Sequence, residues 1–171
     1  MAKILILNGA ARKNGHTATL IKAFLDGAKN ADNNICEFYL QDMNIKGCLG
    51  CESCSYAKKS QSPCKQADDM EQIYEAFLIA DVVVFASPLY FWTVTGTLKT
   101  VVDRLYAQLR SLGYGNFSRK SVLIMTAGGS DYSRAVRWYE TFERNLAWKN
   151  LGKILGTGKT DEAFRLGASI R

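Results

Sequence analysis

Three short segments of the chain are continuously apolar. They cover residues 4–7, 82–86 and 122–125, and each is bounded by glycine, proline or polar residues. A strand that helices cover on both faces has such an unbroken apolar run, so these segments predict central parallel strands. Residues 35–40 are more mixed and residues 153–157 are weaker, which is typical of strands nearer the sheet edges. Five strands are therefore expected.

Between these strands, apolar residues recur at the spacing of amphipathic helices. The spacing predicts four helices, around residues 20–28, 70–77, 98–109 and 135–146. Asp68 and Asp69 are suitable cap or first-turn residues for the second of them. Because strand and helix alternate, we predict an α/β fold, a doubly wound sheet of five parallel strands with helices on both faces.

In such a sheet, ligands bind beyond the carboxyl ends of the strands, where the strand order reverses. The loops expected at that end are residues 8–17, 41–67, 86–97 and 126–133. Any candidate chemistry should come from them.

Length and composition fit one soluble domain, residues 1–171. Apolar residues make up 47% and charged residues 22% of the chain, and there are only two prolines. The apolar run near the N-terminus, residues 4–7, is too short for a secretion signal or a membrane span, so the cytoplasm is the expected compartment and no membrane partner is expected.

The formal net charge of +6 comes entirely from the last third of the chain. Residues 110–171 hold 11 basic and five acidic side chains, whereas residues 1–109 hold 11 of each. Arg134, Arg137 and Arg144 share one predicted helix face. This face is either solvated or a landing surface for an acidic partner, such as a phosphorylated nicotinamide cofactor or a ferredoxin. A nucleic-acid partner is not expected, because no binding motif accompanies the charge.

The first loop, residues 8–17, joins a buried strand to a helix start and reads N-G-A-A-R-K-N-G-H-T. Unpaired N–H groups at a helix start bind anions, and here Arg12 and Thr17 add donors. The loop lacks the spacing of a triphosphate or dinucleotide fingerprint, so a single phosphate is predicted. A similar segment, Gly158-Lys-Thr160, lacks the upstream glycine of a triphosphate loop and is assigned to a surface turn.

Two further loops should face the same crevice. Residues 87–96 place three successive aromatic residues beside a central strand, where a flat ring system would fit, although they could instead plug the core or a subunit interface. Residues 126–132 contain Gly128 and Gly129, which allow a ligand to approach the backbone closely.

Together these motifs resemble the NAD(P)H-dependent FMN reductase family: N-G-A-A-R-K-N-G-H-T at 8–17, S-P-L-Y-F-W-T-V-T-G-T-L-K at 87–99, Asp103-Arg104, and T-A-G-G at 126–129. The resemblance implies a flavodoxin-like fold and an FMN-binding oxidoreductase. Such an enzyme passes electrons from NAD(P)H or ferredoxin through FMN to a small acceptor such as a quinone or flavin. The flavin carries that chemistry, so no catalytic side chain is required. A homodimer or homotetramer is also implied.

The resemblance also implies which residues hold FMN. Its phosphate would lie among Asn8, Ala10, Arg12, Asn14, His16 and Thr17; its ring and ribityl chain would contact Pro88, Leu89, Tyr90, Phe91 and Trp92; and Thr126, Ala127, Gly128 and Gly129 would border the far side of the ring. The chain departs from the family pattern in having Ala10-Ala11 where Ser-Pro is usual, His16 where Asn is usual, and Trp92 where Gly is common.

A cysteine-rich loop, residues 44–67, holds Cys48, Cys51, Cys54 and Cys64 in the spacing C-x2-C-x2-C-x9-C. Overlapping C-x2-C steps wrap a short chain around one centre, as cubane clusters require, whereas structural zinc sites usually use two separated knuckles. The pattern resembles the iron–sulfur flavoprotein branch of the family, although its fourth cysteine is typically closer. A [4Fe–4S] cluster, redox-active thiols and zinc all remain open. Cys36 lies in a predicted strand and is expected to be buried.

Other functions are weighed against the reductase. A non-enzymatic flavodoxin-like electron carrier would usually be acidic, and a zinc-binding regulatory module would bind metal without flavin. A receiver domain is disfavoured because the central strand runs into Ser87-Pro88 instead of an aspartate. A cysteine hydrolase is disfavoured because the one histidine, His16, lies in the phosphate loop.

Overall fold

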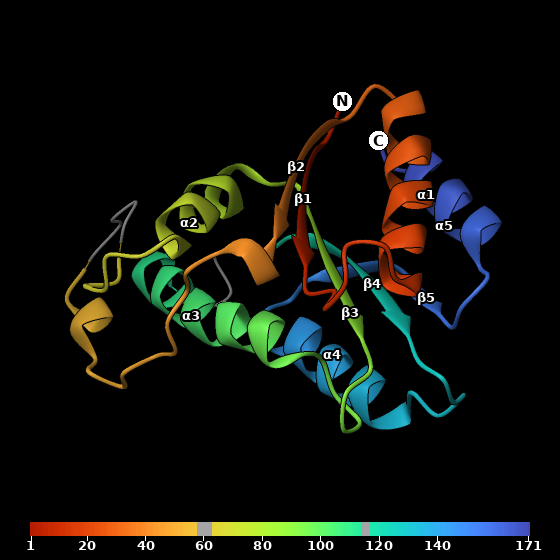
Figure 1. Ribbon diagram of the computed structural model, residues 1–171. Helices are drawn as coiled ribbons and strands as arrows, with labels where there is room; N and C mark the ends of the chain where they lie inside the picture. Colours follow the sequence, from red (N-terminus) through yellow and green to blue (C-terminus); the bar gives the residue numbers. More distant parts are fainter. Residues whose placement is uncertain (58–62, 114–116) are drawn as a thin grey trace.

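The continuous apolar runs become the central strands of one parallel sheet, with strand order β2-β1-β3-β4-β5 (Figure 1). The computed structural model describes residues 1–57, 63–113 and 117–171. Residues 58–62 of the predicted cysteine-rich loop, and residues 114–116, lie outside the described part. The strands are β1 (Lys3–Asn8), β2 (Asn34–Tyr39), β3 (Val82–Pro88), β4 (Lys120–Thr126) and β5 (Lys149–Leu155).

Helices cover both faces of this sheet. They are α1 (His16–Asn30), α2 (Met70–Ile79), α3 (Gly96–Leu112), α4 (Ser133–Asn145) and α5 (Thr160–Ala168), with two short 3-10 turns, η1 (Leu40–Asp42) and η2 (Ser53–Ser55). In Figure 1, α1 and α5 lie side by side against one face, while α2, α3 and α4 cover the other. This flavodoxin-like arrangement confirms the predicted fold class.

Alternate residues of each central strand contribute to two cores. Along β1, Leu5 and Leu7 pack in the core beneath α2, α3 and α4, whereas Ile4 and Ile6 pack beneath α1 and α5. All four side chains are buried. Burial on both faces is the reason that this strand reads as an unbroken apolar run.

The four predicted helices are present, but the fifth helix, α5, was missed. The segment predicted to be a surface turn has a bend at Gly158, and its last residue, Thr160, begins α5. The last strand also begins at Lys149, four residues earlier than predicted, and ends at Leu155. Among the described helices, none has the length and apolar content needed to cross a membrane.

Helix α5 depends on its close packing against α1. A Cβ atom on Gly27 would lie 2.0 Å from the backbone oxygen of Phe164, and one on Gly167 would lie 2.2 Å from that of Phe24. The two helix backbones therefore touch where each helix has a glycine. The buried residues of α5, Ala163 and Gly167, are both small, so the sequence shows no row of large apolar residues there.

The prediction that Cys36 is buried was wrong. Cys36 is exposed on β2, which is an edge strand of the sheet. Three of the six residues from Asn34 to Tyr39 are exposed and the other three are partly buried, whereas Leu40 beyond them is buried. A cysteine on an edge strand does not have the two covering layers that bury a central one.

Candidate functional site

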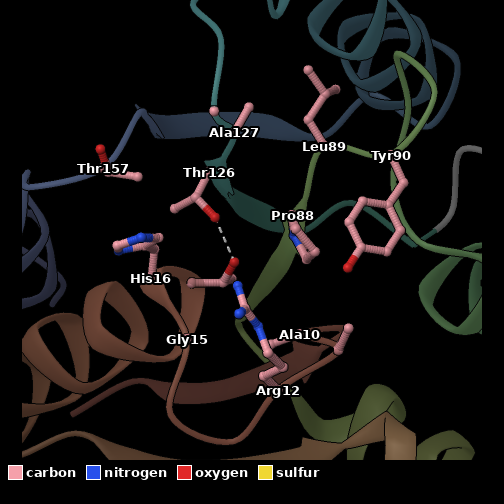
Figure 2. A pocket seen from close by; sticks show the side chains of 13 residues that line it. Ala10, Arg12, Gly15, His16, Pro88, Leu89, Tyr90, Thr126, Ala127 and Thr157 are labelled. Carbon is pink, nitrogen blue, oxygen red and sulfur yellow. Dashed lines mark hydrogen bonds between the residues drawn. The ribbon is translucent and has the colours of Figure 1, made fainter.

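The loops after β1, β3 and β4 enclose a cavity of about 330 Å³ at the carboxyl end of the sheet (Figure 2). The three strands are neighbours in the sheet, which brings their loops together. The residues lining the cavity are Ala10, Ala11, Arg12, Gly15, His16, Thr17, Pro88, Leu89, Tyr90, Thr126, Ala127, Gly128 and Thr157. Its charged or ionisable lining comes from Arg12, His16 and Tyr90, and none of the described lining residues has a carboxylate.

Two buried hydroxyl groups meet at the inner end of the cavity. Thr17 Oγ1 and Thr126 Oγ1 lie 2.7 Å apart and share a hydrogen bond, which Figure 2 marks with a dashed line. Each residue is only 4% exposed. Thr17 lies in the first turn of α1, where Gly15 provides no side-chain cap and no acidic residue is present. The helix start therefore keeps its N–H groups and its partial positive charge available for an anion.

Arg12 adds a full positive charge beside that helix start. A Cβ atom on Gly15 would lie 3.6 Å from Arg12 Nε, so the arginine side chain folds back over the turn that precedes α1. In Figure 2 it points toward Thr126. A guanidinium and two hydroxyls at one helix start can bind a phosphate by charge-assisted hydrogen bonds.

Asn8 shapes the first loop from beneath. Its side-chain oxygen accepts a hydrogen bond from the Ala10 backbone N–H at 3.0 Å, and its amide nitrogen donates to Glu37 Oε1 at 2.8 Å. Gly9 lets the loop approach the start of α3, because a Cβ atom there would lie 2.8 Å from Thr95 Oγ1. Thr95 Oγ1 in turn donates to the Gly9 carbonyl oxygen at 2.9 Å.

Thr95 also fixes the second loop of the cavity. Its backbone N–H donates to Ser87 Oγ at 2.9 Å, and Ser87 Oγ donates to the Pro88 carbonyl oxygen at 2.7 Å. The Leu89 N–H donates to the Thr126 carbonyl oxygen at 2.8 Å, which joins the second loop to the third. All three loops are thus held to one another by hydrogen bonds.

The three aromatic residues of the second loop have different positions. Tyr90 lines the cavity mouth, but Phe91 is 91% exposed and Trp92 is 56% exposed. Phe91 and Trp92 form a two-residue turn between Tyr90 and Thr93 with positive φ angles of 45° and 63°. Residues with a side chain rarely adopt positive φ angles, so the backbone of this turn is strained. The guanidinium of Arg134 lies 5.6 Å from the Trp92 ring centroid.

A wider, more open concavity of about 730 Å³ adjoins the cavity on its far side. Ala127, Gly128 and Thr157 line both spaces, and Gly129 lines only the wider one. A ligand bound in the cavity would therefore be accessible from this side.

The structure brings ten of the predicted cofactor residues to one cavity: Ala10, Arg12, His16, Thr17, Pro88, Leu89, Tyr90, Thr126, Ala127 and Gly128. It places Asn8, Asn14, Phe91, Trp92 and Gly129 outside the lining. It adds Ala11, Gly15 and Thr157, which the sequence analysis did not include. Thr157 could have been suggested by its position at the carboxyl end of the last predicted strand.

The four predicted metal ligands line a second cavity, of about 230 Å³, against α3. Cys48 and Cys51 are exposed there, while Cys54 and Cys64 pack partly against the core. The Ser53 side chain lowers the pKa of the Cys51 thiol, whereas burial raises the pKa of the Cys54 thiol. Among residues 1–57, 63–113 and 117–171, no three His, Cys, Asp or Glu side chains form a group that could hold a single metal ion.

The comparison with protein families gives one match. The model of the family described as NADPH-dependent FMN reductase matches residues 2–142. YwqN of Bacillus subtilis, named an NAD(P)H-dependent FMN-containing oxidoreductase, is 29% identical over 164 residues, which cover 91% of this chain and 85% of that protein.

Several other relatives are named iron–sulfur flavoproteins. One from Archaeoglobus fulgidus is 30% identical over 138 residues, covering 77% of this chain and 64% of its own length. One from Clostridioides difficile is 33% identical over 156 residues, covering 90% of this chain and 65% of its own length. The chain thus spans less than two thirds of each of these two flavoproteins.

Among solved structures, an NAD(P)H:quinone oxidoreductase from Methanothermobacter marburgensis has a similar fold. Its TM-score is 0.71 with 20% sequence identity, and the match covers 98% of this chain and 96% of that one.

Proposed function

The chain belongs to the NADPH-dependent FMN reductase family, and on that premise we propose that it is an FMN-dependent oxidoreductase. FMN would occupy the 330 Å³ cavity and carry electrons from NADPH or NADH to a small acceptor such as a quinone or free flavin. When bound, the flavin supplies the hydride and electron chemistry, and the protein supplies binding and orientation.

The hydroxyl pair of Thr17 and Thr126 is the observation that carries this proposal. Both hydroxyls are buried at the start of α1, and no carboxylate lies among the described residues of the cavity wall. Both hydroxyl groups can rotate about their C–O bonds, so each can donate its proton to an anion that enters the cavity. Together with Arg12 and the helix start, they suit a single phosphate, as in FMN.

The rest of the cavity suits the ring and ribityl chain. Pro88, Leu89 and Tyr90 provide an apolar wall on one side, and Ala127 and Gly128 provide a backbone wall on the other. The hydrogen bonds from Thr95 and Leu89 fix the two walls relative to each other. The residues therefore orient a flat ring and leave its outer side open toward the wider concavity, where a nicotinamide donor and an acceptor could enter in turn.

The cysteine cavity is proposed to hold a metal–thiolate centre, of which a [4Fe–4S] cluster fits best. The four cysteines line one space, and a cubane cluster is held by four cysteine thiolates. Two named iron–sulfur flavoproteins among the relatives support the same choice. Metal analysis that found zinc would favour a zinc site, and metal analysis that found no metal would favour redox-active thiols.

We propose that the exposed surface beside the flavin cavity binds other protein chains. Phe91 and Trp92 project from a strained turn, and Arg134 and Arg137 are exposed on α4. The aromatic turn suits a second copy of the chain in a homodimer or homotetramer, and the basic face suits an acidic carrier such as ferredoxin.

The test is to purify the protein anaerobically, titrate it with FMN, and follow oxidation of NADPH and NADH with a quinone as acceptor. FMN binding with turnover that depends on added FMN is expected. A colourless protein that takes up no FMN would contradict the proposal. Riboflavin, which lacks the phosphate, should bind much more weakly.

A further inference from the structure

The two ends of the cysteine-rich loop are joined by a short ladder of hydrogen bonds, which we call the clasp (residues 44–47 and 66–69). The Asn44 N–H donates to Asp69 Oδ2 at 2.7 Å, and the Asp69 N–H donates to the Asn44 carbonyl oxygen at 3.2 Å. Gln66 Nε2 donates to the Gly47 carbonyl oxygen at 3.1 Å. The clasp closes the loop on either side of the four cysteines.

Arg104 of α3 fastens this clasp to the body of the protein. Its Nη1 donates to the Lys46 carbonyl oxygen at 2.7 Å and to Asp68 Oδ2 at 2.8 Å, and its Nη2 donates to Asp68 Oδ1 at 3.0 Å. Asp68 Oδ2 also accepts from the Lys46 N–H at 3.0 Å. The guanidinium of Arg104 therefore contacts both ends of the cysteine-rich loop, at Lys46 where the chain enters it and at Asp68 just after the chain leaves it.

The ion pair is buried, which makes its geometry important. The Arg104 and Asp68 side chains are each 1% exposed. A buried pair needs all its hydrogen bonds to offset the loss of hydration, so it tolerates little displacement. Burial alone would raise the pKa of the Asp68 carboxyl, but Arg104 and the Lys46 N–H hold it below its usual range.

One donor of Arg104 has no partner in the described part of the protein. Its Nε–H is buried and makes no hydrogen bond. The same side chain lines the cavity that contains Cys48, Cys51, Cys54 and Cys64. Buried donors without a partner are uncommon, and an anionic centre in the cavity would supply the missing acceptor.

We propose that Arg104 is the positioning residue of the cysteine cavity: its two Nη groups hold the loop ends together before a metal–thiolate centre binds, and its Nε–H donates to that centre. This inference rests on the metal part of the proposed function. Partners that orient the ligands of a metal contribute strongly to its retention. Arg104 acts through the loop and not through the flavin cavity.

The test compares wild-type protein with Arg104→Gln after anaerobic reconstitution with limiting ferrous iron and sulfide. Iron, sulfide and FMN per chain are measured together. The variant should retain about a tenth or less of the wild-type iron and sulfide, with unchanged FMN. Arg110→Gln, which removes an exposed arginine from the same helix, is the matched control and should retain wild-type iron.

Equal iron in Arg104→Gln and wild type would overturn the inference and leave the proposed function intact. Wild-type protein that binds FMN but no iron and sulfide would overturn the inference together with the cluster. Wild-type protein that binds no FMN would overturn the proposed function itself.

A second measurement uses the unaltered, metal-free protein, in case Arg104→Gln does not fold. The backbone N–H groups of Asn44 and Lys46 should be protected from hydrogen exchange before any metal is added, because Asp69 and Asp68 accept from them. Exchange at the rate of an unfolded chain would show that the clasp is not preformed and would overturn the inference.

Discussion

Thr17 and Thr126 are 109 residues apart in the chain, yet their hydroxyl oxygens lie 2.7 Å apart. One belongs to the first turn of α1 and the other ends β4. Because β3 separates β1 from β4 in the sheet, the contact spans the carboxyl ends of three strands. The proposed phosphate site therefore needs both threonines in their native positions.

Replacing Thr126 with Val should weaken FMN binding about 10- to 100-fold, because a hydrogen bond to a charged group contributes ~1.5–3 kcal/mol. The effect is measured by titrating FMN fluorescence. Riboflavin is the control ligand, since it has no phosphate and its affinity should be unchanged. An equal loss for both ligands would mean that Thr126 acts on the ring and not on the phosphate.

Replacing Ala10 with Ser should tighten FMN binding. Ala10 lines the cavity, and its backbone N–H is already bonded to Asn8, so a serine there adds one free hydroxyl donor. A gain of roughly three- to tenfold is expected, corresponding to about 0.5–1.5 kcal/mol. Unchanged affinity would indicate that the phosphate is held elsewhere.

Trp92 tests the strain in the aromatic turn. Its φ angle of 63° costs a residue with a Cβ atom about 1–2 kcal/mol, whereas glycine adopts it freely. Trp92→Gly should therefore be more stable than Trp92→Ala by about 1 kcal/mol in urea denaturation. Both variants lose the contact with Arg134, so their difference isolates the backbone. A less stable glycine variant would contradict this account.

The buried pair of Asp68 and Arg104 should make stability depend on acid. The folded-state pKa of Asp68 is lowered, so its contribution is complete above the unfolded pKa of about 3.9 and is lost as the pH falls through the folded value. Asp68→Asn should cost about 3–5 kcal/mol at pH 7, because Arg104 stays buried without its partner.

Urea denaturation at pH 7, 5 and 3 checks this prediction. The difference between wild type and Asp68→Asn should be constant from pH 7 to 5 and smaller at pH 3. Asp103→Asn is the control, because its ion pair with Lys99 is exposed and should contribute less than about 1 kcal/mol. A constant difference down to pH 3 would exclude titration of Asp68.

Gly167→Ala should destabilise the protein although alanine favours helices by about 1 kcal/mol over glycine. Its Cβ atom would lie 2.2 Å from the Phe24 backbone oxygen, so α5 would have to move from α1 at a cost of about 1–3 kcal/mol or more. Gly96→Ala is the control, because no atom lies within 4 Å of its added Cβ. In thermal unfolding, Gly167→Ala should lower the melting temperature and Gly96→Ala should raise it.

The sequence predicted those parts of the fold that depend on local patterns. The three central strands have unbroken apolar runs because both of their faces are covered, and α1 to α4 repeat their apolar residues at helical spacing. The loop after the first strand also contains glycine, arginine and threonine before a helix start, and this combination indicates an anion site.

The features that the sequence did not predict depend on contacts between distant residues. Helix α5 packs closely against α1 at Gly167, and the presence of a glycine in the sequence does not indicate which distant residue it contacts. Cys36 was expected to be buried because strand pattern alone does not tell an edge from a centre. Asp68 was expected to start a helix, and it does accept from the Met70 N–H, but its pairing with Arg104 joins residues 36 apart.

The order β2-β1-β3-β4-β5 has a further consequence for how the coenzyme and the folded state are linked. Since Thr17 and Thr126 meet only when β1, β3 and β4 are aligned, the proposed FMN site would exist in the native sheet but not in a chain that lacks β4 pairing. Added FMN should then raise the melting temperature, by the equivalent of about 2.7 kcal/mol at a concentration 100 times its Kd. Coenzyme supply would thus set how much of the protein persists in its folded form.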